Sequence, residues 1–184
     1  MRLRGIVSRV NLAASDFELF GLPERFAQDR PTIDARWKDL QREAHPDKFA
    51  AQGGAAQRLA MQWSVRINEA YKRLKDPLQR ASYLCELRGA PVDAENNTAM
   101  PADFLVEQME WREALEEART QADLDTLEVT LGRARAETLK LIARALDEQG
   151  DAGSAAKHVR ALMFIERFGH DVEERIEQLG QSAP

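Results

Sequence analysis

Cysteine is almost absent from this chain of 184 residues, because Cys85 is the only one. A single cysteine excludes an intrachain disulfide and a zinc site made of several thiolates, and it is typical of a reducing compartment. His158 and His170 lie far apart on one expected helix, without the spacing of a metal-binding pair. We therefore expect no metal site and no cofactor.

Long apolar runs are also missing, and no stretch approaches the roughly 20 residues that a membrane span needs. The first 14 residues carry Arg2, Arg4 and Arg9 and no acidic residue, but they lack the apolar core of a secretory signal. We interpret residues 1–14 as a short flexible arm, and we expect no contact with a membrane.

Aromatic residues make up only 7% of the chain, whereas 31% of the residues are charged. Because β-branched and aromatic residues are too sparse for a sheet protein, this composition favours an all-α fold. The net charge of −5 is unevenly distributed, since residues 1–90 hold 16 Lys and Arg against 11 Asp and Glu, and residues 91–184 hold 10 against 20. A balance of +5 in one half and −10 in the other predicts no nucleic-acid binding, because the acidic half repels phosphate.

Four helices are expected in the basic half. The first is a single turn capped by Ser15, and the second begins at Asp29 and ends near His45, because Pro46 cannot continue it. A third follows a loop that includes Gly53 and Gly54, and a fourth starts at Asp76 and Pro77. The second and third have apolar stripes of matching length, which predicts an antiparallel hairpin with the loop at its tip. These stripes are Ile33, Trp37, Leu40 and Ala44, and Leu59, Trp63, Ile67, Ala70 and Leu74.

Three longer helices are expected in the acidic half, over about 101–120, 122–149 and 154–179, and their hydrophobic positions suit a three-helix bundle. On the first, at about 100° per residue, the core stripe is Phe104, Trp111, Leu115 and Ala118. Val106 and Met109 fall on the other side among glutamates, with Leu105 at the flank. An exposed apolar patch rimmed by carboxylates is typical of a partner-binding surface. The alternative is that Val106 packs against a neighbouring helix.

The loop sequence His45-Pro46-Asp47 resembles the signature of J-domain proteins, which dock on DnaK-type chaperone ATPases and stimulate ATP hydrolysis. A tripeptide alone is weak evidence, and Pro46 and Asp47 are also ordinary turn residues. Its context strengthens the resemblance, because Trp37, Leu40, Gln41 and Arg42 stand before it and Ile67-Asn68-Glu69-Ala70-Tyr71-Lys72-Arg73-Leu74-Lys75-Asp76-Pro77 after it.

A finer resemblance is to the HscB family of iron–sulphur cluster co-chaperones. It rests on Phe20-Gly21-Leu22-Pro23, Asp39-Leu40-Gln41-Arg42, His45-Pro46-Asp47-Lys48-Phe49-Ala50 and Phe104-Leu105-Val106-Glu107-Gln108-Met109-Glu110. The resemblance implies a J domain at 15–88, a linker at 89–100 and a three-helix bundle at 101–180. It also implies two partners, a DnaK-type chaperone (HscA) and the iron–sulphur scaffold protein IscU. Some eukaryotic relatives carry N-terminal cysteine pairs, which this chain lacks. We expect a bacterial cytoplasmic protein rather than one of the mitochondrial matrix.

Two sets of site residues follow. The chaperone-binding set consists of the loop and a basic helix face that suits an acidic partner: His45, Pro46, Asp47, Lys48, Arg36, Lys38 and Arg42. The alternative for the basic residues is that they are ordinary solvated surface charges. The scaffold-binding set is carried over from the HscB resemblance: Leu105, Val106, Met109, Glu110, Glu113, Glu117 and Phe164. Phe164 lies at the edge of the last helix's stripe, so packing against a neighbouring helix is the alternative for it too.

Two other functions are alternatives to a co-chaperone that joins a DnaK-type chaperone to an iron–sulphur scaffold. In one, the J domain is kept but the bundle binds a different client. In the other, His45 and Asp47 form the catalytic pair of an enzyme, which lacks support because neither a nucleophile nor a metal accompanies them. We therefore expect no enzymatic activity.

Overall fold

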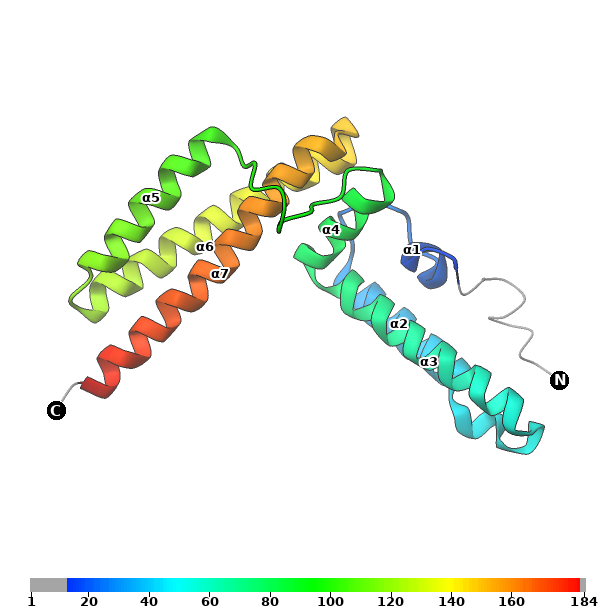
Figure 1. The fold of residues 1–184 in the computed structure, drawn as a ribbon. Helices are drawn as coiled ribbons and strands as arrows, with labels where there is room; N and C mark the ends of the chain where they lie inside the picture. Colours follow the sequence, from blue (N-terminus) through cyan, green and yellow to red (C-terminus); the bar gives the residue numbers. More distant parts are fainter. Residues whose placement is uncertain (1–12, 183–184) are drawn as a thin grey trace. The chain divides into compact units, whose positions relative to one another are not determined.

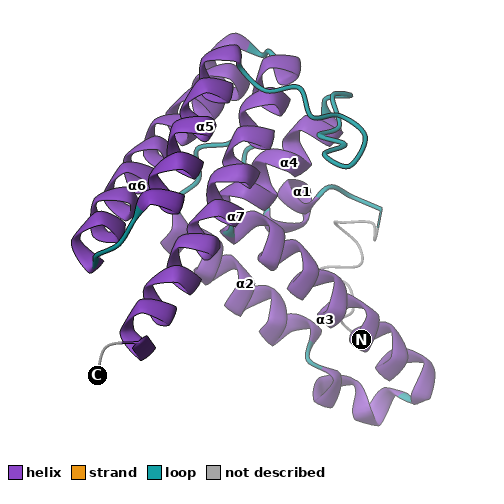
Figure 2. Cartoon of the chain, turned by 60° about the vertical axis from the view of Figure 1, so that its left-hand side comes forward, coloured by secondary structure: helices purple, strands orange, loops and turns teal. Residues whose placement is uncertain are grey.

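The computed structural model describes residues 13–182, and every regular element in this range is a helix (Figures 1 and 2). The all-α prediction is therefore confirmed. Contacts divide the chain into two compact units, residues 1–80 and 81–184. The predicted arm lies outside the described residues except for Ala13 and Ala14, so its flexibility stays a prediction.

The first unit contains α1 (Asp16–Phe20), α2 (Arg30–Ala44) and α3 (Gly54–Lys75). The predicted N-caps are confirmed, because the Ser15 hydroxyl accepts from the Glu18 backbone N–H and an Asp29 carboxylate oxygen accepts from that of Thr32. Helices α2 and α3 lie side by side as a hairpin (Figure 1). Its buried side chains largely follow the two predicted stripes: Ile33, Ala44, Ala60, Trp63, Ile67, Ala70 and Leu74.

A buried ion cluster connects α1 to α3. Asp16 is fully buried, and its two carboxylate oxygens lie 2.6 Å from Arg66 Nη1 and 2.9 Å from Arg73 Nε. Arg36 makes a second connection, because its Nε donates to the Phe20 carbonyl oxygen over 2.7 Å. Gly21 has a φ of 62°, and a Cβ there would lie 2.6 Å from Arg36 Nη2. Glycine therefore suits the end of α1 both for its φ and for the close guanidinium.

The loop between α2 and α3 differs from expectation. Most of it forms a 3-10 helix, η1 (Pro46–Gln52), and Gly54 is already the first residue of α3. Phe49 is only 4% exposed. The predicted loop therefore ends at Gly53, one residue earlier than expected, and a buried aromatic ring and the fixed φ of Pro46 organise it.

Helix α4 (Pro77–Leu87) begins as predicted, since the Asp76 carboxylate accepts from the backbone N–H of Gln79 over 2.8 Å. The division between units falls inside this helix, after Arg80. Leu84 and Cys85 are fully buried, and Arg88 donates to the Leu146 carbonyl oxygen over 2.6 Å. The domain boundary at residue 88 stays a prediction.

The second unit contains α5 (Ala102–Glu117), α6 (Gln121–Ala143) and α7 (Ala152–Ser182). A π-helical stretch, η2 (Arg144–Gln149), continues α6 to Gly150, the predicted end, where φ is 65°. Side chains from all three helices form one core: Phe104, Trp111, Leu127, Leu131, Ala161, Ile165, Phe168 and Val172.

The segment 89–100, predicted as a linker, is attached to α7. Arg160 is 5% exposed, and it donates to the carbonyl oxygens of Val92 over 2.7 Å and Ala99 over 2.6 Å. Val92 is itself buried. This stretch thus packs on the second unit by hydrogen bonds from one arginine.

Candidate functional site

The tip loop (His45 to Lys48) holds its polar groups in a defined arrangement. His45 ends α2 in an extended conformation, with φ −60° and ψ 124°, as a residue before proline requires. Its Nδ1 accepts from the Asp47 backbone N–H over 3.3 Å, and its carbonyl oxygen accepts from the Lys48 N–H over 3.1 Å. The imidazole is thereby fixed against the first turn of η1.

The Asp47 carboxylate of the tip loop is highly accessible to solvent. Its side chain is 87% exposed, and Oδ2 lies 3.6 Å from His45 Nδ1, beyond hydrogen-bond distance. The nearby Phe49 ring is buried and anchors η1 to the hairpin. The structure therefore presents a carboxylate to solvent on a backbone that proline and a buried ring restrict, which suits docking on a basic partner.

Polar side chains connect α2 to α3 behind the tip loop. The Asn68 side-chain oxygen accepts from Trp37 Nε1 over 3.0 Å and from Gln41 Nε2 over 2.7 Å, and the Ser64 hydroxyl donates to Gln41 Oε1. Trp37 also stacks on Tyr71, with ring centroids 4.8 Å apart. These contacts fix the register of the hairpin and so the position of its tip. Trp37, Gln41, Asn68 and Tyr71 belong to the J-domain pattern, but their pairing could not be predicted from their positions in the sequence.

The three predicted basic residues of α2 do not share one face. At about 100° per residue, Lys38 and Arg42 are separated by about 40° and face away from the core stripe, whereas Arg36 is more than 100° from both. Arg36 is also bonded to the Phe20 carbonyl. Arg42 is exposed and lies 3.4 Å from Asp39 Oδ1. The structure thus groups Lys38 with Arg42 and gives Arg36 a structural contact, while the binding roles of all three stay predictions.

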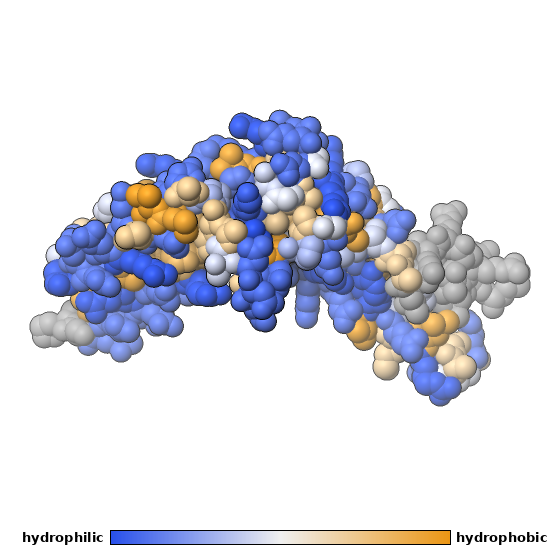
Figure 3. Space-filling view, turned by 45° about the horizontal axis from the view of Figure 1, so that its top comes forward, coloured by the Kyte–Doolittle hydropathy of each residue, from blue (hydrophilic) through white to orange (hydrophobic). Residues whose placement is uncertain are grey.

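The outer face of α5 carries an apolar patch (Leu105, Val106 and Met109). These side chains are 42%, 58% and 70% exposed, whereas Phe104 and Trp111 on the opposite side are 6% exposed. Figure 3 shows hydrophobic side chains gathered among hydrophilic ones in the part of the molecule that α5 helps to form. The predicted exposure of Val106 and Met109 is therefore confirmed.

An acidic rim (Glu110, Glu113 and Glu117) lies beside the apolar patch, and all three residues are exposed. They follow one another at intervals of three and four residues, so they line one side of α5 together with Val106. Burying Val106 against a partner thus brings these carboxylates close to that partner's surface. A complementary surface combines an apolar contact with Lys or Arg around it.

Phe164 differs from the rest of its predicted set. It is only partly exposed, and its ring centroid lies 5.8 Å from that of Phe104 and 5.7 Å from that of Phe168. The Arg112 guanidinium carbon lies 5.4 Å from the Phe164 ring centroid. Phe164 therefore packs at the edge of the bundle core beneath Arg112, in agreement with the alternative interpretation of this residue. Its role in binding stays a prediction.

Comparison with known proteins places this architecture. A family model described as the HSCB C-terminal oligomerisation domain matches residues 100–173. A co-chaperone protein HscB homolog from Burkholderia mallei is 49% identical over 172 residues, which cover 92% of this chain and 98% of that protein. This chain belongs to the HscB family of co-chaperones. The HscB homolog from Burkholderia cenocepacia is 48% identical with the same coverage of both chains.

Two solved HscB structures resemble the chain over most of its length. Chaperone HscB from Vibrio cholerae is 35% identical with a TM-score of 0.76, and the match covers 90% of this chain and 99% of that one. Human co-chaperone protein HscB is 26% identical with a TM-score of 0.79, covering 90% of this chain and 84% of that one. The predicted family and fold are thereby confirmed.

The remaining polar groups in the described part of this HscB family member do not form a metal centre. Within residues 13–182, no three His, Cys, Asp or Glu lie together as metal ligands. No helix of the same range is long and apolar enough to cross a membrane. Cys85 is fully buried, and this burial raises the pKa of its thiol to about 11. The tip loop and the α5 surface are the candidate sites that we assign within the described residues.

Proposed function

We propose that this protein stimulates ATP hydrolysis by a DnaK-type chaperone (HscA) and delivers the iron–sulphur scaffold protein IscU to it, during iron–sulphur protein maturation in the cytoplasm. The chaperone hydrolyses ATP, and the protein itself catalyses no covalent step. Membership of the HscB co-chaperone family supports the chaperone partner. The observation that carries the proposal is the tip loop, which presents an 87% exposed carboxylate at the end of a polar cross-linked hairpin.

Charge supports the contact with the chaperone. Lys38 and Arg42 lie on the outer face of α2, and Lys48 is exposed in the tip loop itself. An acidic surface on the chaperone is attracted by these cations, while Asp47 pairs with a basic residue within it. Surface cations mainly raise the association rate, so the tip loop supplies the specific contact.

The scaffold contact is assigned to the apolar patch and its acidic rim in the other unit. An exposed apolar patch of this kind is typical of a binding surface, and three nearby carboxylates select a partner with basic residues. The two candidate sites belong to separate compact units, so each proposed partner is assigned to a unit of its own. This separation supports an adaptor that brings two proteins together.

A steady-state ATPase assay with the cognate chaperone tests the proposal. We expect His45→Gln to bring the stimulated rate down to the basal rate of the chaperone, because the ring that orders Asp47 is lost. His170→Gln is the matched control, since His170 is an exposed histidine on α7 and its loss leaves the tip loop intact. Stimulation that survives His45→Gln contradicts the proposal.

Adding the scaffold to the same assay separates the two partner assignments. Stimulation that exceeds the sum of the separate effects of protein and scaffold supports delivery of IscU. The His45→Gln variant should still bind the scaffold, as its substitution is in the other unit. Stimulation without any effect of the scaffold favours the alternative, a J-domain co-chaperone for a different client.

Self-association of the bundle is a second candidate for the α5 surface, because the family model matched at residues 100–173 is described as an oligomerisation domain. Sedimentation velocity over a range of concentrations distinguishes it from scaffold binding. If the apolar patch joins copies of this chain, Val106→Ala/Met109→Ala shifts the distribution toward the monomer. If the patch binds only the scaffold, the distribution is unchanged and scaffold binding is lost.

A further inference from the structure

Helix α3 carries an exposed apolar pair, Met61 and Val65, that belongs to neither candidate site. Their side chains are 58% and 53% exposed, and they lie one turn apart on the same side of the helix. Trp63 and Ile67, which are buried, lie on the opposite side. The pair therefore adds nothing to the hairpin core, and its exposure requires another explanation.

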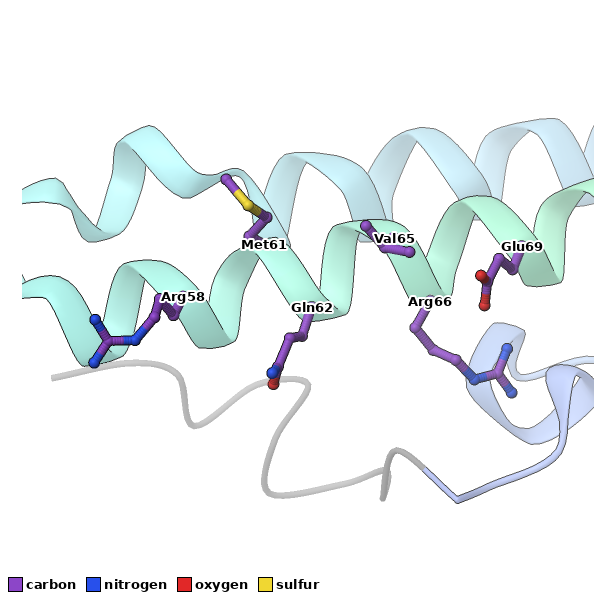
Figure 4. Close-up of a pocket in the computed structure, with 6 residues that line it drawn as sticks. All are labelled: Arg58, Met61, Gln62, Val65, Arg66 and Glu69. Atoms are coloured by element: carbon purple, nitrogen blue, oxygen red, sulfur yellow. The ribbon is translucent and has the colours of Figure 1, made fainter.

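These two side chains line a shallow groove of about 420 Å³ along α3, together with Arg58, Gln62, Arg66 and Glu69. In Figure 4 Arg58, Gln62 and Arg66 point to one side of the helix, and Met61 and Val65 lie along its upper edge. The groove thus has an apolar margin and a polar one. The residues that line it extend from position 58 to position 69 along one helix, which suits a segment of extended chain lying beside α3.

The start of the described chain lies at this groove. The Ala14 carbonyl oxygen accepts a hydrogen bond from Arg66 Nη2 over 2.9 Å, and Arg66 is one of the groove residues. Met61 is five residues before Arg66 on α3, which is about 7.5 Å along the helix axis. Two or three extended residues, at about 3.3 Å each, span that distance. The twelve residues that precede Ala13 are therefore long enough to cover the whole groove.

The composition of residues 1–12 suits the apolar margin of the groove. They include Leu3, Ile6, Val7, Val10 and Leu12, and no acidic residue. Arg58 and Arg66 repel the arginines of this segment while Glu69 attracts them, so charge does not decide the contact and apolar burial has to drive it. A segment tethered at Ala14 also has an effective concentration near the millimolar range at the groove, which a separate protein does not have.

We propose that residues 1–12 dock on the α3 groove and cover Met61 and Val65 with their apolar side chains. The contact at the α3 groove is then made within one chain, by its own N-terminal segment. It is distinct from the tip loop and from the α5 surface, so the proposal does not depend on either partner.

Paramagnetic relaxation in the full-length chain tests this contact. A nitroxide is attached to Ser8→Cys at pH 7, where buried Cys85 does not react because its thiol pKa is raised to about 11. We expect strong broadening of the Met61 and Val65 methyl signals. The Val129 methyls on α6, which are similarly exposed in the other unit, serve as the unaffected reference.

Two variants of the labelled chain test the cause of the broadening. Ile6→Ser/Val7→Ser removes two apolar side chains without a change of charge, and the broadening should be lost. Asn11→Ser, a substitution in the same segment that removes no apolar side chain, should keep it. Broadening equal to that of Val129, or unchanged by Ile6→Ser/Val7→Ser, overturns the proposal.

A mixed sample excludes a second copy as the occupant. One batch carries the nitroxide without isotope label, and the other carries labelled methyl groups without the nitroxide. Broadening at Met61 and Val65 in this mixture shows contact between two chains and overturns intramolecular docking. We expect no broadening in the mixture, and broadening only in the chain that carries both the nitroxide and the labelled methyl groups.

Discussion

Truncation of the apolar patch to Val106→Ala/Met109→Ala should weaken scaffold binding strongly and leave folding almost unchanged. Burying a side chain of this size completely is worth about 1.5–3 kcal/mol. More than half of each side chain is exposed, at 58% and 70%, so most of this gain is still available to a partner. Allowing for the part of each side chain that alanine retains, the pair contributes about 2–3 kcal/mol to the free energy of binding. Its loss should raise the Kd for the scaffold about 30- to 150-fold.

The free energy of unfolding should change by less than about 0.5 kcal/mol in the same variant, because surface substitutions outside a core or a cap seldom cost more. Phe104 and Trp111 on the buried side of α5 are untouched. Binding is measured by isothermal titration calorimetry with purified scaffold, and stability by urea unfolding followed by circular dichroism. Loss of binding without loss of stability separates a binding surface from a structural one.

Val129→Ala provides the matched control. Val129 is 64% exposed on α6, in the same unit as Val106, and the same side-chain atoms are removed. It lacks the acidic rim, and it should bind the scaffold like the unmodified chain. The apolar patch is not the binding surface if the double variant keeps its affinity for the scaffold, or if Val129→Ala weakens scaffold binding as much as Val106→Ala does.

Two further predictions concern the core of each unit. Asp16→Asn should lower the free energy of unfolding by about 2–4 kcal/mol, since it leaves two arginines at a buried site without their counter-charge. Asp39→Asn, in an exposed ion pair, should change the free energy of unfolding little. Urea unfolding of both variants measures the difference, and equal effects would contradict a stabilising buried cluster. Cys85 should resist iodoacetamide at pH 8 until urea unfolds the chain. The free energy of unfolding should fall as pH rises from about 9 to 11, because the thiol ionises at lower pH in the unfolded state than in the folded state. If the Cys85→Ala variant shows the same pH dependence as the unmodified chain, the pKa of Cys85 is not raised.

Helix ends were predictable where a local signal sets them. The side chains of Ser15, Asp29 and Asp76 each accept a backbone hydrogen bond within three residues, so type and spacing along the sequence suffice to place a helix start. Gly150 ends η2 by a left-handed conformation that glycine adopts readily. The 3-10 helix η1 was missed because seven residues are too few for a periodic apolar pattern, and Phe49 alone does not indicate which way its ring points.

Arginine contacts over long distances in sequence were not predictable. Arg160 reaches the carbonyl oxygen of Val92, 68 residues away, and Arg36 reaches that of Phe20. A backbone carbonyl is present at every residue, so its role as acceptor leaves no trace in the residue type. The same holds for Asp16, which looks like an ordinary first-turn acid until α3 brings Arg66 and Arg73 to it.

The α5 surface shows where helical periodicity stops being sufficient. Val106 and Met109 were placed correctly because their angle from the core stripe puts them on the outer side of α5, where they are 58% and 70% exposed. Phe164 depends on how closely α7 approaches α5, and there its ring stacks with Phe168 and lies under Arg112. Truncation of Phe164 therefore removes core packing together with the predicted binding contact. A loss of scaffold affinity in Phe164→Ala identifies a binding residue only if the free energy of unfolding is unchanged, whereas Val106 and Met109 allow the two effects to be measured separately.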